Sequence, residues 1–342
     1  MPVRNFYLAI ICSLIFAVSA EGGQGVISIH YPPEGGTIME YGIIGISLGV
    51  PGGAADEISI TANKGGTRHI AVQREFVCFT VSLKPGLNNI EIAALKEKTV
   101  VDRAVLSVFR RSDLISKYRV PPQDFKKVYF HSGEHAACRK CHALEPGVFD
   151  RKPISPATFS ADAFDSETVI AATSTCYSCH RALTAYPYVH GPASVWSCLS
   201  CHDPESAPRY SVGKPDSVVC YGCHVEQKNR WLSMKYHHGP VTNGKCTICH
   251  SPHASENPFN LFKPTWQLCV NCHPEKGTGK HVIAESSSSE GHPTRNRKDP
   301  VRTGRDLTCA SCHNPHASDS PHLWAFKVQG ALQLCRKCHY DK

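Results

Sequence analysis

Methionine and long apolar runs are the scarce features of this sequence. Its 342 residues contain only three methionines, so few thioether groups exist to bind a metal. Outside residues 6–18, no segment is apolar over the length that a membrane crossing needs, which excludes a polytopic membrane protein. Apolar residues still make up 41 % of the chain, which excludes a wholly disordered protein. Cysteine, with 18 copies, and histidine, with 20, are unusually abundant.

Residues 1–20 predict a secretory signal peptide. Arg4 supplies the positive start, residues 6–18 are nearly all apolar, and Val-Ser-Ala at residues 18–20 offers a small-residue cleavage site. An uncleaved anchor is the alternative, but the run is short for about 30 Å of hydrocarbon. A lipoprotein attached through Cys12 is disfavoured by the bulky isoleucine before it. We therefore expect an exported protein, in the periplasm, at the outer membrane or at the cell surface, with no transmembrane segment after cleavage.

Residues 21–111 predict a small all-β domain. About seven short apolar runs lie between clusters of Gly, Pro and Asn, which is typical of an antiparallel sandwich. Val77, Phe79 and Val81 alternate as the inward residues of one strand. Residues 83–92, Leu-Lys-Pro-Gly-Leu-Asn-Asn-Ile-Glu-Ile, resemble the strand–turn–strand signature of bacterial immunoglobulin-like modules. That resemblance implies an immunoglobulin-like sandwich for this region.

Cys78 lies between these inward residues and is interpreted as an unpaired thiol of the sandwich without a redox role. Residues 112–130, with two consecutive prolines near their middle, predict a linker. From residue 131 the sequence loses both strand alternation and long helical periodicity. Few aliphatic residues remain there for an apolar core, so something else must fill the interior.

Sixteen of the eighteen cysteines fall in eight copies of Cys-x-x-Cys-His. The paired cysteines are Cys138 and Cys141, Cys176 and Cys179, Cys198 and Cys201, Cys220 and Cys223, Cys246 and Cys249, Cys269 and Cys272, Cys309 and Cys312, and Cys335 and Cys338. The histidines that follow them are His142, His180, His202, His224, His250, His273, His313 and His339.

This motif attaches c-type haem. Two thiols on one helical turn reach the two vinyl groups of the porphyrin, and the adjacent histidine binds the iron from below. Zinc ribbons also use paired cysteines, but four-coordinate zinc does not require a histidine after every pair. Redox disulfides use Cys-x-x-Cys typically once per fold and without that histidine. We therefore expect eight covalently bound haems c, with iron as the metal.

The eight motifs form four doublets, whose first cysteines are 38, 22, 23 and 26 residues apart. The third and fourth doublets add Cys-His-x-Pro-His, and the first two lack it. The later doublets resemble the doubled Cys-x-x-Cys-His family of multihaem cytochromes c. That resemblance implies an octahaem cytochrome domain over residues 131–342, with haems packed into a mostly irregular, short-helical fold.

The second axial ligand of each iron is expected to be histidine. Ten further histidines lie in residues 113–342, whereas Met234 is the only methionine there, so at most one haem has His/Met ligation. The expected distal ligands are His131, His135, His190, His238, His253, His292 and His316, with the eighth drawn from His237, His281 or His322.

Irons with two histidine ligands have no vacant position, so the sequence predicts electron transfer and no catalytic residues. The expected partners are a quinol-linked or periplasmic donor and a periplasmic, outer-membrane or extracellular acceptor.

One alternative is a multihaem reductase of nitrite, hydroxylamine or sulfur oxyanions with one open haem, although no Cys-x-x-Cys-Lys occurs. Another is self-assembly into an extracellular cytochrome filament. The net charge of +8 would offset the negative charge that about sixteen haem propionates leave beside eight ferric centres. Lys and Arg are therefore interpreted as propionate partners, and no nucleic-acid partner is expected.

Overall fold

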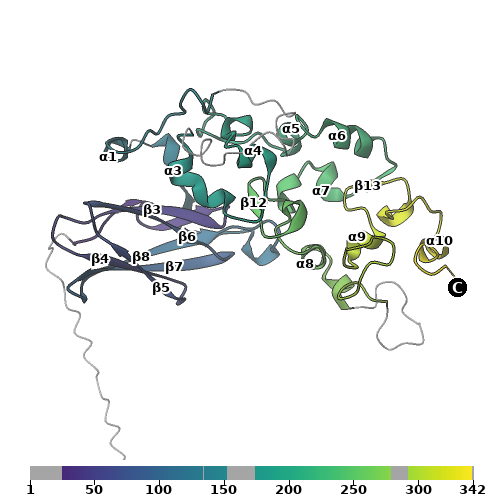
Figure 1. Cartoon of the computed structure of the whole chain (residues 1–342), viewed down its shortest axis with the longest axis horizontal. Helices are drawn as coiled ribbons and strands as arrows, with labels where there is room; N and C mark the ends of the chain where they lie inside the picture. Colours follow the sequence, from purple (N-terminus) through teal and green to yellow (C-terminus); the bar gives the residue numbers. More distant parts are fainter. Residues whose placement is uncertain (1–24, 134, 152–173, 279–291, 341–342) are drawn as a thin grey trace, which may run out of the picture.

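A computed structural model describes residues 25–133, 135–151, 174–278 and 292–340. The β-rich region lies at one end of the molecule, and the short helices follow from it towards the other end (Figure 1). α1 (Ala136–Arg139) and α3 (Tyr177–His180) lie beside the β-rich region, and α9 (Cys309–Cys312) and α10 (Ala331–Cys335), near the end of the chain, lie farthest from it (Figure 1). The predicted signal peptide lies outside the described residues.

The N-terminal region is a two-sheet β-sandwich, as the sequence predicts. The first sheet contains, in order, β1 (Ser28–Tyr31), β3 (Ile43–Gly49) and β6 (Phe76–Ser82). The second contains, in order, β5 (Thr67–Ala71), β4 (Glu57–Ala62), β7 (Gly86–Lys96), β8 (Thr99–Arg110), β2 (Gly36–Met39) and β9 (Phe125–Lys127). Two details differ from the expectation. The pairing of β2 with β8 and β9 is parallel, and β9 comes from the predicted linker.

The sandwich has an apolar core made by its own side chains. Sixteen buried apolar residues form one cluster, and Ile58, Ile90 and Val108 within it have no exposed surface. Burial alternates along β6, where Val77 is buried and the next residue, Cys78, is exposed. Each fully buried aliphatic side chain contributes about 1.5–3 kcal/mol, so this core is large enough to hold the sheets together.

One buried amide fixes the turn between β6 and β7. Asn88 is fully buried; its side chain accepts the Lys84 backbone N–H at 2.9 Å and donates to the Lys84 and Gly86 carbonyls, both at 2.8 Å. Gly86 has φ = +94°, and a Cβ there would lie 2.5 Å from the Tyr118 ring. Only glycine fits both the left-handed backbone and the contact.

The C-terminal region consists of short helices, single 3₁₀ turns and two-residue strand pairs. Its helices are α1 (Ala136–Arg139), α3 (Tyr177–His180), α4 (Gly191–Ser194), α5 (Ser217–Cys220), α6 (Val225–Leu232), α7 (Gly239–Thr242), α8 (Thr265–Val270), α9 (Cys309–Cys312) and α10 (Ala331–Cys335). The 3₁₀ turns among the described residues are Ser116–Tyr118, Phe130–Ser132, Arg181–Thr184, Cys198–Ser200, Cys246–Ile248, Pro258–Asn260, Pro274–Thr278 and Pro321–Leu323. Strand β10 (Tyr188–Val189) pairs with β12 (Ala254–Ser255), and β11 (Tyr236–His237) pairs with β13 (Ala317–Ser318).

This region confirms the predicted irregular, short-helical fold. Among its described residues, the buried apolar cluster contains only Val195 and Trp196, with Phe149 and Tyr177 packed against it. None of the helices in the described part of the chain is long and apolar enough to cross a membrane.

Candidate haem-binding sites

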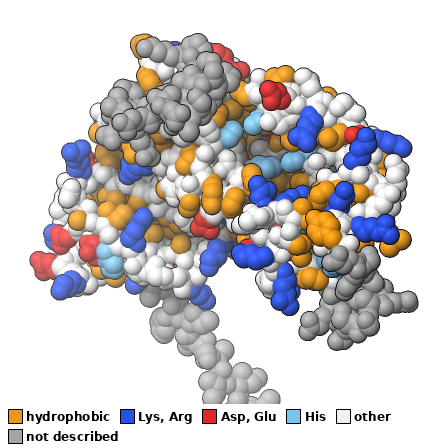
Figure 2. Space-filling model, turned by 45° about the vertical axis from the view of Figure 1, so that its right-hand side comes forward, with side chains coloured by type: hydrophobic (Ala, Val, Ile, Leu, Met, Phe, Trp, Pro, Cys, Tyr) orange, Lys and Arg blue, Asp and Glu red, His pale blue; other side chains and the backbone are white. Residues whose placement is uncertain are grey.

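The eight motifs line one continuous cavity of about 3620 Å³. A pocket for a single small ligand measures about 300–1000 Å³, so this cavity is several times larger than one ligand needs. All eight motif histidines line it. On the face drawn in Figure 2, histidine side chains are visible in a hollow among hydrophobic side chains, with Lys and Arg nearby. The space that an apolar core would occupy is thus open and bordered by cysteine and histidine.

Every motif folds into the same single turn. In all eight copies the backbone N–H of the histidine donates to the carbonyl of the first cysteine, at 2.9–3.1 Å. This is the hydrogen bond of one helical turn, and it brings residues three and four apart to the same side. The two thiols and the imidazole of each motif are therefore arranged as thioether attachment and iron ligation require.

Six motif histidines face a second histidine across the cavity. The ring centres of these pairs are 6.0–6.3 Å apart: His180 with His131, His224 with His190, His202 with His253, His273 with His238, His250 with His316, and His339 with His292. Two imidazoles that bind one metal from opposite sides, each through a nitrogen about 2.0 Å from it, have ring centres about 6 Å apart. The residues present therefore fit a haem iron with two histidine ligands.

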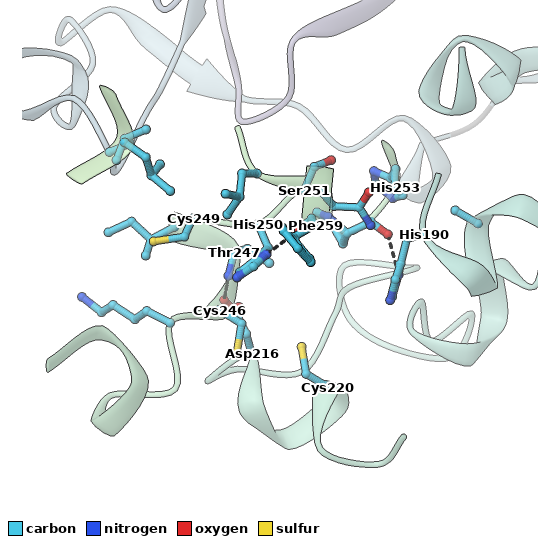
Figure 3. Close-up of a pocket in the computed structure, with 18 of the residues that line it drawn as sticks. His190, Asp216, Cys220, Cys246, Thr247, Cys249, His250, Ser251, His253 and Phe259 are labelled. Atoms are coloured by element: carbon cyan, nitrogen blue, oxygen red, sulfur yellow. Dashed lines mark hydrogen bonds between the residues drawn. The ribbon is translucent and has the colours of Figure 1, made fainter. Parts of the chain in front are cut away.

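Backbone carbonyls fix the ring nitrogens of these histidines. Nδ1 of His202 donates to the Tyr210 carbonyl at 2.8 Å. Nδ1 of His250 donates to the Phe259 carbonyl, also at 2.8 Å (Figure 3). Both carbonyls belong to residues with left-handed backbone, φ = 62° and 60°. A proton fixed on Nδ1 leaves Nε2 unprotonated towards the cavity, which is the form that binds a metal.

Three of the candidate distal histidines are held in the neutral form by their surroundings. Burial, and after it the facing His180 imidazole, lowers the pKa of His131 to about 4. Burial also lowers the pKa of His253 and of His316 to about 4, with a facing motif imidazole as the next cause. A metal ligand must be deprotonated, so these side chains are ready to bind iron at neutral pH.

The imidazole pairs follow a repeat rule that links neighbouring doublets. A histidine upstream of a doublet faces the second motif of the same doublet, as His190 faces His224. The histidine of a Cys-His-x-Pro-His element faces the first motif of the preceding doublet, as His253 faces His202. The two kinds of distal histidine are held together, because the His190 N–H donates to the His253 carbonyl at 2.8 Å. The second and third doublets are thus each completed by the next one along the chain.

Cysteines of successive motifs are neighbours throughout the chain. Between doublets, the first cysteines of adjoining motifs lie close enough to shift each other's pKa: Cys176 and Cys198, Cys220 and Cys246, and Cys269 and Cys309. Within doublets, burial first and then the thiols of the partner motif raise the pKa of Cys201, Cys249 and Cys312. The pKa of Cys138 is raised by burial, then by Cys78 of the sandwich, and then by Cys179 of the partner motif. The eight candidate sites therefore form one unbranched series in sequence order.

The β-sandwich borders the first part of this series. Its outward residues Ser47, Cys78 and Thr80 line the same cavity as His142. The Tyr41 ring lies 5.2 Å from the His253 ring, and the Cys78 thiol donates to the Ser47 hydroxyl at 3.5 Å. Cys78 is thus an exposed thiol on the surface that faces the candidate haem sites.

The structure brings six of the seven predicted distal histidines to a motif histidine, and it places His135 elsewhere. The His135 ring stacks on Phe130 at 3.9 Å and its Nε2 is hydrogen-bonded to the Phe130 carbonyl. Three histidines were candidates for the eighth ligand. Nε2 of His237 is hydrogen-bonded to the Trp231 carbonyl, and the centre of the His322 ring lies 5.4 Å from that of Trp324. His281 lies outside the described residues. Ligation itself stays a prediction.

Sequence reasoning missed a set of buried aspartates that join motifs. Asp216 is buried, and its carboxylate accepts the backbone N–H and the hydroxyl of Thr247, both at 2.7 Å (Figure 3). Burial would raise the pKa of Asp216, but hydrogen bonds from Lys214 and Thr247 outweigh it and lower the pKa. Asp150 accepts hydrogen bonds from Thr175 in the same way. The only sequence signal was a Ser or Thr beside the next motif, which is too common to single out.

Doubled Cys-x-x-Cys-His motifs of this geometry indicate a multihaem c-type cytochrome that binds haem c covalently. Three segments, residues 190–229, 238–278 and 299–342, match the family described as "Doubled CXXCH motif". Each segment spans one doublet, and two of them begin at His190 and His238, the upstream histidines of the repeat rule. The first doublet lies outside the matched segments. Haem c is attached outside the cytoplasm, so this class of protein implies export.

Other comparisons add no functional information. No curated protein matches the chain. Two of the similar solved structures are the fibronectin(III)-like modules of Clostridium thermocellum CbhA and the endo-beta-1,4-mannanase from Thermotoga petrophila. The first is 8 % identical with a TM-score of 0.21, over 25 % of this chain and 94 % of that one. The second is 10 % identical with a TM-score of 0.21, over 28 % of this chain and 22 % of that one.

Proposed function

We propose that the chain is an electron-transfer protein that carries eight haems c, most of them bound by two histidines. The observation that carries this proposal is the set of six imidazole pairs with ring centres 6.0–6.3 Å apart. Bound haem would supply one-electron Fe(III)/Fe(II) chemistry. Two imidazoles per iron leave no position for a substrate, which favours electron relay over catalysis at these six sites.

The unbranched order of the sites supports a relay from one end of the molecule to the other. A cysteine of each motif influences the pKa of a cysteine in the next, from the Cys138 motif beside the sandwich to the Cys335 motif near the far end. Electron transfer along a series requires that neighbouring redox sites lie close together. The sandwich end and the C-terminal end are therefore the proposed entry and exit points.

The proposed partners are other redox proteins of the cell envelope. A quinol-linked or periplasmic protein would donate electrons, and a periplasmic, outer-membrane or extracellular protein would accept them. Haem binding itself is supported by the Lys and Arg side chains dispersed around the hollow (Figure 2), which are available to pair with haem propionates.

Haem counting and redox titration test this proposal. Alkaline pyridine spectra of the purified, matured protein should report eight haems c per chain. A spectroscopic redox titration should then show eight electrons taken up at low potentials, as two histidine ligands favour. A colourless protein, or one that carries zinc, would show that the proposal is wrong. Fewer than eight haems with reversible reduction would correct the number and keep the function.

A further inference from the structure

The first doublet departs from the repeat rule at one position. In the second and third doublets, the first motif histidine faces the histidine that follows Pro252 or Pro315 in the next doublet. The equivalent element for the first doublet is Asp203-Pro204-Glu205. Glu205 therefore occupies the sequence position at which the distal histidine of the His142 iron would be expected. Its side chain is exposed and does not line the cavity.

The backbone at Glu205 has the same local turn as at a distal histidine. The Glu205 N–H donates to Oδ1 of Asp203 at 2.9 Å, and the His316 N–H donates to Oδ1 of Asn314 at 3.0 Å. In both cases the acceptor lies two residues earlier, on the other side of a proline. The turn is thus kept in the second doublet, and the side chain after the proline is what differs.

No other imidazole replaces the missing one within the described residues. His142 lines the cavity, but none of the described histidine rings faces it. His135, its nearest neighbour in sequence, stacks on Phe130 and does not line the cavity. His281, the one histidine outside the described residues, belongs to the insertion before the fourth doublet.

Small side chains of the sandwich border the cavity near this motif. Ser47, Cys78 and Thr80 project from the outward face of β3 and β6, where Ser47 pairs with Cys78, and Thr80 pairs with Gly45, which has no side chain. Their hydroxyl and thiol groups are hydrogen-bond donors that an iron-bound ligand could use.

We propose that the haem held by Cys138, Cys141 and His142 has an exchangeable sixth position, and that it binds a small external ligand at its iron. The ligand class is a small molecule or anion that coordinates through carbon or nitrogen, with carbon monoxide as the ferrous probe and cyanide as the ferric probe. This inference rests on the proposed function in one respect, because it requires the chain to carry haem.

Carbon monoxide titration of the fully reduced holoprotein is the primary test. One CO should bind per chain, which is one of eight haems, and the ferric protein should give a high-spin signal in electron paramagnetic resonance that cyanide removes. A protein with eight haems, no CO binding and only low-spin iron would overturn the inference and leave the relay proposal intact. A protein without haem c would instead contradict the proposed function.

Variants locate the open site. Glu205→His should introduce the missing imidazole and lower CO binding at least tenfold, whereas Glu205→Ala should keep one CO per chain. His253→Ala serves as the positive control and should raise the count from one CO to two. A Glu205→His protein that still binds one CO with unchanged affinity would contradict the assignment to the first haem.

Two more variants identify a competing ligand from the chain itself. His135→Ala and Cys78→Ser should each retain one CO per chain and the high-spin ferric signal. If the wild-type protein binds no CO and one of these variants binds one, that side chain is the sixth ligand and the inference is wrong.

Discussion

The two regions of this chain fill their interiors in different ways. The sandwich buries sixteen apolar residues of its own, whereas the buried apolar cluster described in the C-terminal region contains only Val195 and Trp196. In place of a core, the second region has a cavity of about 3620 Å³ bordered by the motif cysteines and histidines. A side-chain core is complete when the chain folds, but a cofactor-filled interior is complete only after the cofactor is attached. Stability and cofactor content should therefore be coupled in one region and independent in the other.

The largest expected effect is the loss of structure in only one region when haem is withheld. We expect mature protein produced without haem attachment to keep residues 25–127 folded and to lose the fold of residues 131–340. The reason is that a group binding only the folded state supplies folding free energy, and without it this region lacks an apolar core. Limited proteolysis with mass spectrometry should recover a protected sandwich fragment.

The holoprotein under the same digestion is the control and should be protected in both regions. An apo-protein whose C-terminal region resists the protease as well as the holoprotein does would refute this comparison. Such a result would mean that short-range hydrogen bonds alone hold the motifs in place.

A core substitution in the sandwich should have the opposite pattern. Ile90→Ala removes a fully buried side chain and should lower the free energy of unfolding of the sandwich by about 2–5 kcal/mol. Hydrogen exchange followed by mass spectrometry should show faster exchange in β4 and β7, while the haem absorption spectrum stays the same. Val105→Ala, at a side chain that is 63 % exposed, is the matched control and should change little. Loss of haem in the Ile90→Ala protein would contradict the independence of the two regions.

Asp216→Asn should give a smaller effect, within the C-terminal region. The substitution removes the charge that accepts the Thr247 N–H and hydroxyl and pairs with Lys214, so we expect a loss of about 1–3 kcal/mol in the free energy of unfolding. Denaturant unfolding monitored by haem absorbance measures it. Asp306→Asn removes an exposed partner of Lys298 and should cost less than about 1 kcal/mol. Equal losses in the two variants would argue against a structural role for the buried aspartate.

The two regions also differ in how much of their fold the sequence predicts. In the sandwich, strand alternation such as that of Val77, Phe79 and Val81 is a local signal, and the structure confirms it. The strand β9 and the parallel pairing of β2 could not be predicted, because a strand of three residues carries no periodicity of its own. Pairing between segments far apart in sequence depends on tertiary packing rather than on local pattern.

In the candidate sites, the residues of the attachment motif are adjacent in the sequence, whereas the histidine that faces each motif is far away in the sequence. The Cys-x-x-Cys-His spacing predicts attachment wherever it occurs, and it identified the cavity-lining residues. Which histidine faces which motif could not be read from the sequence, because His253 faces His202 across 51 residues. The position of Glu205 becomes informative only once that repeat rule is visible in three dimensions.

The smallest expected effect concerns a surface ion pair beside the first motif. Arg209 donates to both carboxylate oxygens of Glu145, at 3.0 and 2.7 Å, and this hydrogen bond is the main reason that the pKa of Glu145 is lowered from 4.5 to about 2. A lowered pKa adds stability above pH 4.5, and that contribution is lost as the pH falls towards 2. Because both side chains are partly exposed, Glu145→Gln should cost less than about 1 kcal/mol at pH 7. The difference from the wild type should shrink below pH 4.5 and with added salt, in denaturant unfolding measured from pH 7 to pH 2.5.

Glu256→Gln, at an exposed glutamate for which the described structure gives no ion pair, is the control. A difference that stays constant over this pH range would mean that the Gln side chain disturbs packing near His142 rather than charge.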